Sequence, residues 1–168
     1  DENAHLAILD GRDIIYIAKG ETTNAMRVAS YVGLRIPAHA TAVGKVLLAQ
    51  LDASAILDLY AGRTLEAMTP RTTTRLHELL GELRSVATDG FAFDDEESTS
   101  GLQCLAVPVH DASGQCVAAL SVSVPTMRMV GLDRTALLGV VQGHADELSA
   151  RLGAVPARLR PRPSGDRP

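Results

Sequence analysis

Residues 90–125 contain three apolar runs in close succession, and this pattern constrains the fold more than any other feature. An acidic turn separates the first run from the second, and residues 111–114 separate the second from the third. Because alternate residues of a strand point to opposite faces, each run has one apolar face and one face of small and polar residues. The mixed face contains Ala92, Asp94, Leu102, Cys104, Ala106, Val117, Ala119, Ser121 and Ser123. We interpret it as the floor of a small-molecule pocket.

The first third of the chain contains further strand-like runs. Residues 5–9 and 14–18 are rich in β-prone side chains, and the Asp-Gly pair between them indicates a hairpin. Residues 25–31 are predicted to form a third strand. Residues 33–37 are interpreted as irregular, because proline disfavours helix in the residue before it. The chain opens on a strand without a methionine, so we expect a fragment of a longer protein.

Helical segments follow these strands. Thr41 is predicted to cap a short apolar helix that continues to residue 51. Residues 52–61 are predicted to form a second helix. A longer amphipathic helix is expected to start from a cap on Thr73 or Thr74 and to end at Gly90.

The C-terminal part predicts one more helix and a tail. Residues 126–133 are interpreted as a connection and residues 134–152 as an amphipathic helix. Residues 155–168, rich in proline and arginine, are interpreted as a disordered tail. The order of strands and helices predicts one α+β domain over residues 1–154. Its antiparallel sheet is expected to be covered by helices on one face.

Composition narrows the classes of function. The chain has 168 residues, enough for one domain with a full core. A net charge of −4 and an aromatic content of 3% argue against a nucleic-acid surface on this segment. No apolar run is long enough to cross a membrane. The two cysteines lack metal-ligand spacing, which favours a cytosolic setting without a disulfide.

The acidic run after the first apolar segment is the first chemical candidate. Strand alternation places Asp94 on the mixed face. We interpret Asp95, Glu96 and Glu97 as a solvated turn. No loop of the sequence offers several oxygen ligands at the spacing that a hard metal ion requires.

Cys104 is the candidate nucleophile. It would need a neighbouring base to form a thiolate, and nothing in the sequence fixes His39 or His110 beside it. A transition-metal site made of Cys104, His39 and Asp94 is chemically reasonable but equally unsupported by spacing. The simplest interpretation is a buried cysteine that packs as a small hydrophobic residue.

Two hydroxyls and one helix start favour ligand binding over catalysis. Ser121 and Ser123 lie on one face of a central strand, where buried hydroxyls need hydrogen-bond partners. No Gly-x-Ser-x-Gly turn is present to activate either serine. The N–H groups of Ala42, Val43 and Gly44 begin the first predicted helix, where orphan donors and the helix dipole attract a carboxylate.

Three blocks of the sequence resemble the C-terminal effector-binding domain of IclR-type bacterial transcription regulators. The first is LAILDGRDIIY at residues 6–16, and the second is IPAHATAVGKVLLA at residues 36–49. The third begins with GFAFDDEE at residue 90 and continues through GLQCLAVPV at residues 101–109 to SVSVP at residues 121–125. One departure is Val124, where the family commonly has glycine before the proline.

The resemblance implies a GAF-like or profilin-like fold with an antiparallel sheet of about six strands flanked by helices. It also implies an upstream winged helix-turn-helix domain, absent from this chain, which would bind operator DNA as a dimer or tetramer. No cofactor is implied. The family ligand site matches Ala42, Val43, Asp94, Cys104, Ser121 and Ser123, with apolar walls at Val28, Ile36 and Leu102.

These observations predict a sensor of a small organic acid, which can be aromatic. The helix-start N–H groups and the two serines would hold its carboxylate. Asp94 would accept a hydrogen bond from a hydroxyl, or would be protonated in the complex. Ala25, Val28, Ile36 and Leu102 would set the ligand size. The alternatives are an enzyme on the same fold with Cys104 as nucleophile, or an oligomerisation module with a vestigial pocket.

Overall fold

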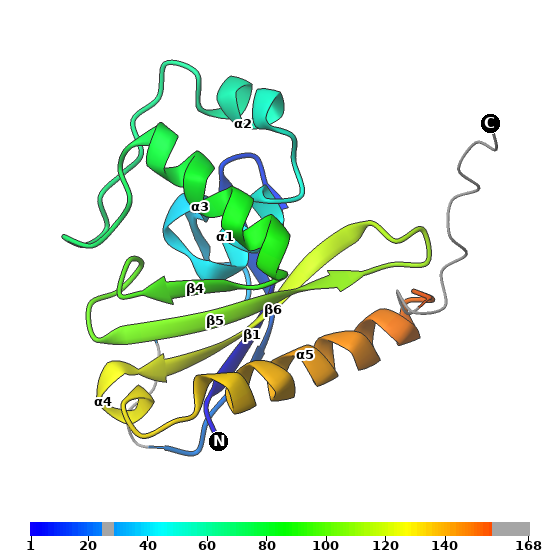
Figure 1. Cartoon of the computed structure of the whole chain (residues 1–168). Coiled ribbons are helices and arrows are strands. Elements are labelled where there is room, and N and C mark those ends of the chain that lie inside the picture. The colour runs from blue at the N-terminus through cyan, green and yellow to red at the C-terminus, as the bar shows by residue number, and fades with distance from the viewer. Residues whose placement is uncertain (25–28, 156–168) are drawn as a thin grey trace.

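In the computed structural model, the described residues form one sheet of six antiparallel strands in the order β3-β2-β1-β6-β5-β4 (Figure 1). The structure describes residues 1–24 and 29–155. The strands are β1 (Asn3–Asp10), β2 (Asp13–Gly20), β3 (Arg35–Pro37), β4 (Ala92–Asp95), β5 (Leu102–His110) and β6 (Cys116–Pro125). The pairing of β1 with β6 joins the two halves of the chain at the centre of the sheet. This architecture confirms the predicted fold class.

The hairpin predicted at the Asp-Gly pair is present, and β5 and β6 form a second one. Strands β1 and β2 pair around Gly11, whose positive φ of 62° suits a tight turn. Strands β5 and β6 pair around a turn that Asp111 stabilises, because its Oδ1 accepts hydrogen bonds from the N–H groups of Ser113 (2.9 Å) and Gln115 (3.2 Å). These turns set the register of the central strands.

The predicted third strand at residues 25–31 is wrong where it can be compared. Residues 29–31 belong to no strand, and residues 25–28, which include Ala25 and Val28, lie outside the described residues. The third strand is instead β3, within the segment predicted to be irregular. Among residues 1–24 and 29–155 it pairs with β2 alone, at the sheet edge, a position where a strand tolerates Pro37.

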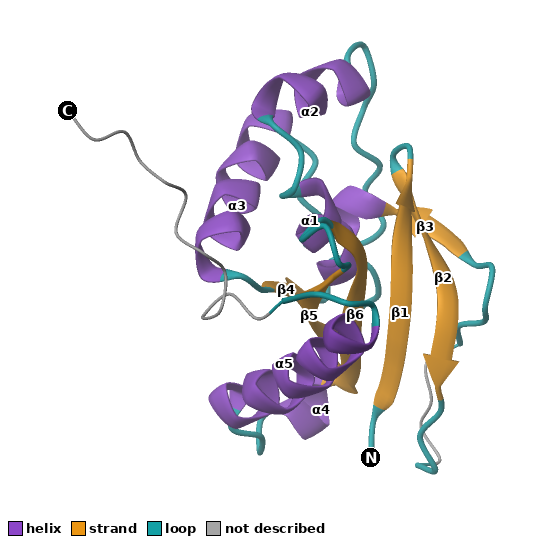
Figure 2. Ribbon diagram, turned by 90° about the vertical axis from the view of Figure 1, so that its right-hand side faces the viewer, coloured by secondary structure: helices purple, strands orange, loops and turns teal. Residues whose placement is uncertain are grey.

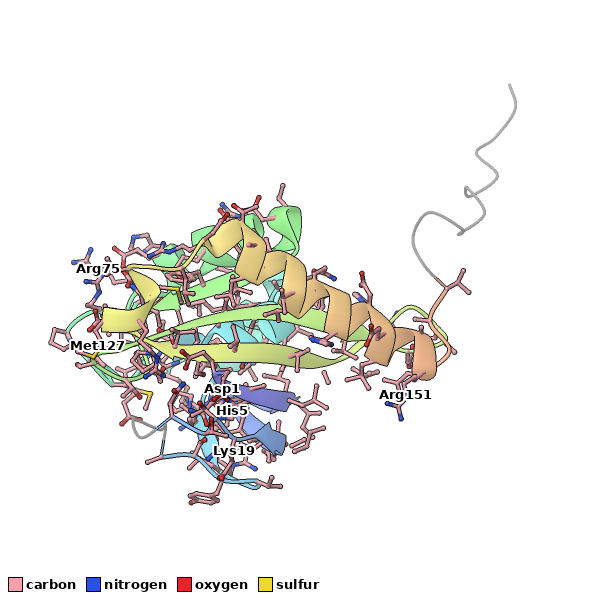
Figure 3. The ribbon with its side chains drawn as sticks, turned by 90° about the horizontal axis from the view of Figure 1, so that it is seen from below. Asp1, His5, Lys19, Arg75, Met127 and Arg151 are labelled. Carbon is pink, nitrogen blue, oxygen red and sulfur yellow. The ribbon has the colours of Figure 1, made fainter. Side chains whose placement is uncertain are left out.

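Helices cover both faces of the sheet, which corrects the expectation of a single covered face (Figure 1 and Figure 2). On one face lie η1 (Ala38–Ala40), α1 (Ala42–Leu48), α2 (Ala53–Tyr60) and α3 (Leu76–Asp89). On the other lie α4 (Thr126–Met129) and α5 (Arg134–Arg151), and α5 runs across the sheet in Figure 3. Each face has its own apolar core, because both faces of β5 and β6 are buried.

The helix ends follow the sequence in part. Thr41 caps α1 by accepting a hydrogen bond from the Gly44 N–H at 3.0 Å, and Gly90 ends α3 with a φ of 77°. The cap position of α3 is Arg75, so the predicted cap at Thr73 or Thr74 is wrong. The Thr73 hydroxyl instead donates to Glu82 at 2.6 Å.

The C-terminal region differs in two details from its prediction. The connection predicted at residues 126–133 contains the short helix α4. Helix α5 packs its apolar stripe on the sheet, but Leu152 lies beyond its end and is 45% exposed. Val155 lies in no helix or strand, and the rest of the predicted tail, residues 156–168, lies outside the described residues. Within the described part, no helix has both the length and the apolarity needed to span a membrane.

Candidate functional site

Strand register gathers the predicted polar residues into one row on the sheet face beneath α1. Asp94 of β4 lies opposite Cys104 of β5, which lies opposite Ser123 of β6, which lies opposite Asn3 of β1. We call these four residues the polar row. It crosses four adjacent strands, a span of about 14 Å between the outer Cα atoms. All four side chains are buried, which separates them from bulk water.

A second row runs beside the first on the same face. It places Ser121 opposite Ala106 on one side and opposite His5 on the other. Its members lie two positions along each strand from those of the polar row, so both rows are on the same face of the sheet, toward α1. The small side chain of Ala106 leaves Ser121 and His5 as the polar groups of this row.

Helix α1 and the turn before it form the roof over these rows. Ala42 and Val43 are buried at the helix start and belong to the core on this face. Gly44 permits a very close approach, because a Cβ there would lie 2.1 Å from the carbonyl oxygen of Ala38. Its N–H is already bonded to Thr41, so a ligand would compete with the helix cap for that donor.

Hydrogen bonds connect three side chains of the floor. The Cys104 Sγ and Ser123 Oγ lie 3.2 Å apart, and Ser123 Oγ lies 3.5 Å from His5 Nδ1. His5 Nε2 in turn lies 2.7 Å from Ser30 Oγ, and its ring stacks on Tyr16 at a centroid distance of 4.6 Å. In Figure 3, His5 and Lys19 mark the neighbouring strands β1 and β2.

Burial keeps these groups uncharged near neutral pH. It lowers the pKa of His5 to about 4, with help from the positive charge of Lys19. It raises the pKa of Cys104 to about 12, and the Asp94 carboxylate acts in the same direction. Burial also raises the pKa of Tyr16, as do the nearby Cys104 and Asp94. The floor therefore offers neutral hydrogen-bonding groups rather than a thiolate nucleophile.

Asp94 is held at the outer end of the polar row by the turn that follows it. Its Oδ1 accepts a hydrogen bond from the Glu97 N–H at 2.7 Å, and its Oδ2 accepts one from the Ser98 hydroxyl at 2.6 Å. Burial raises the pKa of Asp94, although these hydrogen bonds and Lys45 oppose the change. The turn thus fixes the carboxyl group while the protein interior disfavours its charge.

The expectation that Glu97 belongs to a solvated turn is wrong. Its carboxylate lies 2.6 and 2.7 Å from the Nζ of Lys45, and both side chains are buried. The same Nζ lies 2.5 Å from Glu82 Oε2 on α3. Burial lowers the pKa of Lys45, but the two carboxylates outweigh this effect and leave it raised. We call Lys45, Glu97 and Glu82 the buried bridge, which ties α1 to α3 and to the turn after Asp94.

Threonines fix the same turn from another side. The hydroxyl of Thr72 donates to the Glu97 carbonyl at 2.6 Å, and that of Thr69 donates to the Glu96 carbonyl at 2.7 Å. Asp95 is half-buried and paired with Arg71. The acidic run is therefore an ordered part of the site wall, and only its outer residues contact solvent.

The remaining predicted residues divide into those beside the site and those outside the description. Leu102 is buried and Ile36 half-buried, and both pack in the core on the α1 side. Ala25 and Val28 lie outside the described residues. His39 Nε2 lies 2.9 Å from the Glu66 carbonyl oxygen, and the His39 ring packs edge-on against Tyr60. The described residues contain no group of three or more histidine, cysteine or acidic side chains arranged for a metal.

Sequence reasoning missed Asn3, His5, Tyr16 and Lys45 as members of the site. Strand alternation in β1 puts Asn3 and His5 on one face with Ala7, and two polar residues on an otherwise buried face are a signal present in the sequence. The missing information was strand order, because only the pairing of β1 with β6 brings this face beside Ser121 and Ser123.

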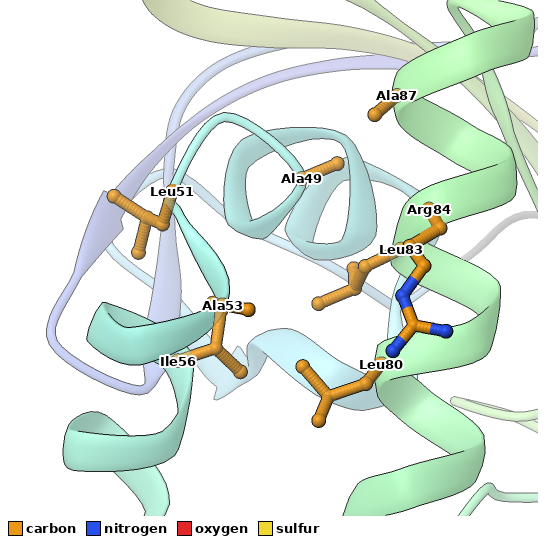
Figure 4. Close-up of a pocket in the computed structure, with 8 residues that line it drawn as sticks. All are labelled: Ala49, Leu51, Ala53, Ile56, Leu80, Leu83, Arg84 and Ala87. Carbon is orange, nitrogen blue, oxygen red and sulfur yellow. The ribbon is translucent and has the colours of Figure 1, made fainter.

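A separate shallow hollow lies between α1, α2 and α3 (Figure 4). Apolar side chains line most of it, including Ile56 of α2 and Leu80 and Leu83 of α3. Arg84 contributes a charged rim. None of the sequence-predicted site residues lines this hollow, so it is distinct from the floor described above.

Comparison with known proteins gives a consistent result. The family model described as bacterial transcriptional regulator IclR C-terminal matches residues 1–150. The HTH-type transcriptional regulator KdgR of Escherichia coli is 37% identical over 152 residues, which cover 90% of this chain and 58% of KdgR. The chain spans about half the length of the curated relatives it matches.

Solved structures share the same fold. The Thermotoga maritima IclR structure has a TM-score of 0.81 and 30% identity, with 90% of this chain and 62% of that chain covered. The inducer-binding domain of a PobR double mutant from Acinetobacter, in complex with 3-hydroxybenzoic acid, has a TM-score of 0.78 and 30% identity. That match covers 88% of this chain and 87% of the PobR domain.

Proposed function

Because this chain belongs to the IclR family of bacterial transcriptional regulators, as a C-terminal domain, we propose that it binds a small organic acid and thereby modulates operator binding. The ligand-binding domain comprises residues 1–154. A winged helix-turn-helix domain upstream of it in the full-length protein contacts DNA, and the regulator acts in the cytoplasm as a dimer or tetramer. The relatives named HTH-type regulators, about twice as long as the match, support this division.

The polar row and its neighbour Ser121 carry the proposal. Several hydrogen-bonding groups are buried beneath one short helix, although burying a polar group costs free energy unless it is paired. This concentration of polar groups supports a site for a polar ligand. The serine hydroxyls and the N–H groups of Ala42 and Val43 donate to the carboxylate of the effector. Asp94 accepts from a hydroxyl on the effector, and Ile36 and Leu102 limit its size.

Effector binding changes DNA affinity only if the effector favours one of two arrangements of the oligomer. Strand β6 is the natural connection between the proposed effector site and the rest of the regulator, because it carries both serines and continues directly into α4. Arg128 of α4 holds Glu2 through two hydrogen bonds of 2.7 and 2.6 Å, next to the first residue of the chain. A shift of β6 on binding therefore reaches the side of the domain where the upstream segment attaches.

The test is thermal unfolding with a panel of acids containing pyruvate, lactate, benzoate and 3-hydroxybenzoate. A ligand at about 100 times its dissociation constant adds roughly 2.7 kcal/mol, which raises the melting temperature by about 5–10 °C. The Ser121→Ala, Ser123→Ala double variant should lose this response. Ser85→Ala, which removes an exposed hydroxyl from α3, is the matched control and should keep it. An unchanged response in the double variant would refute the site assignment.

Cysteine labelling tests the enzyme alternative. A thiol with a pKa of about 12 is almost entirely protonated at neutral pH and is a poor nucleophile. We expect iodoacetamide at pH 7 to modify Cys104 only after the protein is unfolded. Rapid stoichiometric modification of Cys104 in the folded protein would instead favour catalysis.

A further inference from the structure

Asn3 presents an unexplained donor at one end of the polar row. Its side chain is completely buried, yet its Nδ2 has no hydrogen-bond partner anywhere in the described residues. The Oδ1 accepts only a long hydrogen bond of 3.5 Å from the Thr22 N–H. A buried amide without a partner is costly, and native proteins rarely retain one without a reason.

The position of Asn3 supplies the reason. Its register partner is Ser123, and on β1 it shares a face with His5, so its side chain lies on the ligand side of the sheet. Asp94, at the opposite end of the same row, accepts hydrogen bonds through both oxygens. The row therefore has an unpaired donor at the β1 end, while the carboxylate at the β4 end is held in place and keeps free lone pairs for a further donor.

We propose that Asn3 is an additional effector-binding residue whose side-chain amide donates to an oxygen of the bound acid. This inference rests on the proposed function. The serines and the helix start already serve the carboxylate, so the Asn3 amide recognises a second acceptor oxygen, either a carbonyl or a second carboxylate. The effector then belongs to the keto acids or dicarboxylic acids, and simple monocarboxylic acids are discriminated against because they leave this donor unpaired.

The first test needs no ligand. Asn3→Leu replaces the unpaired amide with an apolar side chain of similar size, so we expect the ligand-free protein to melt about 3 °C or more above the wild type. Thr72→Val is the matched control, since the Thr72 hydroxyl is buried and fully bonded to Glu97, Thr69 and Met68. This control should melt lower. A lower melting temperature in Asn3→Leu would show that Asn3 is structural and would overturn the proposal.

The second test measures discrimination by calorimetric titration of butyrate, 2-oxobutyrate and succinate. We expect wild type to bind one of the latter two at least tenfold more tightly than butyrate, and Asn3→Leu to reduce that ratio to near one. A preference that persists in Asn3→Leu would overturn the role of Asn3. If the proposed function itself is wrong, the result is different. No acid of the panel then raises the melting temperature of wild type, and the serine double variant behaves as wild type.

Discussion

The two faces of the sheet are built from the same strands but differ in chemistry. On the α5 side, β5 and β6 present Leu105, Val107, Val122 and Val124 to an apolar core. On the α1 side the intervening residues of those strands include Cys104, Ser121 and Ser123, next to Asn3 and His5 of β1. We infer that the α5 face provides stability, while the α1 face keeps hydrogen-bonding capacity for recognition.

The largest expected effect tests the buried bridge on the α1 face. Lys45→Met leaves Glu97 buried beside a half-exposed Glu82 without their cation, which should cost about 3–5 kcal/mol. Differential scanning calorimetry should show a melting temperature about 10 °C lower. Arg35→Met, which breaks an exposed pair with Asp10, is the control and should change little. If Lys45→Met and Arg35→Met lower the melting temperature by equal, small amounts, the bridge is not buried in solution.

The next prediction concerns the apolar face. Leu105→Ala removes a fully buried side chain beneath α5 and should destabilise the protein by about 2–4 kcal/mol, measured by urea unfolding. Leu57→Ala, at a half-exposed leucine of α2, should cost much less. The affinity of the folded Leu105→Ala protein for the best acid should match wild type. A loss of affinity would contradict the assignment of stability to the α5 face and of ligand recognition to the α1 face.

A glycine pair tests the roof over the α1 face. Gly44→Ala places a methyl group against the backbone of Ala38 and should cost about 1–3 kcal/mol. Gly81→Ala introduces the same group into α3, where nothing lies within 4 Å, and should stabilise by about 0.5–1 kcal/mol. Melting temperatures that change in opposite directions support the close packing of η1 on α1. A rise in both would refute it.

The smallest effect is a pH dependence that the α5 face should lack. Burial raises the pKa of Asp94 in the folded protein above the unfolded value of 3.8. The unfolded chain therefore loses this proton first as the pH rises, and the folded state is progressively disfavoured up to its own pKa. Asp94→Asn removes that penalty. Melting curves from pH 4 to 8 should show the melting temperature of wild type falling relative to that of the variant as the pH rises. The opposite trend would contradict the burial of Asp94.

Strand alternation predicted much of the fold and the floor of the site. It separated Cys104, Ser121 and Ser123 from Leu105, Val122 and Val124. The structure places the last three in the core beneath α5, and it places Cys104 in the core on the α1 side. It failed at β3, because a three-residue edge strand that contains Pro37 has too few residues to show a period.

Long-range pairing explains the other errors. Glu97 resembles any residue of an acidic turn until Lys45, 52 positions earlier, is placed against it. Asn3 and His5 can be assigned to the site only once β1 is paired with β6, which is more than a hundred positions away in the sequence. A local pattern predicts the face of the sheet on which a residue lies. The residues that it contacts there depend on the order and register of the strands.

The contact between Gly44 and Ala38 constrains how this site can diversify. The helix start lies directly on the preceding turn, and any side chain at position 44 would push the two apart. Larger side chains at position 44 should therefore destabilise the helix start. Under the proposed function, ligand preference would change more readily through the strands below, where exchanging one small or polar side chain leaves the backbone in place. The close contact thus makes the helix start the less substitutable side of the proposed site.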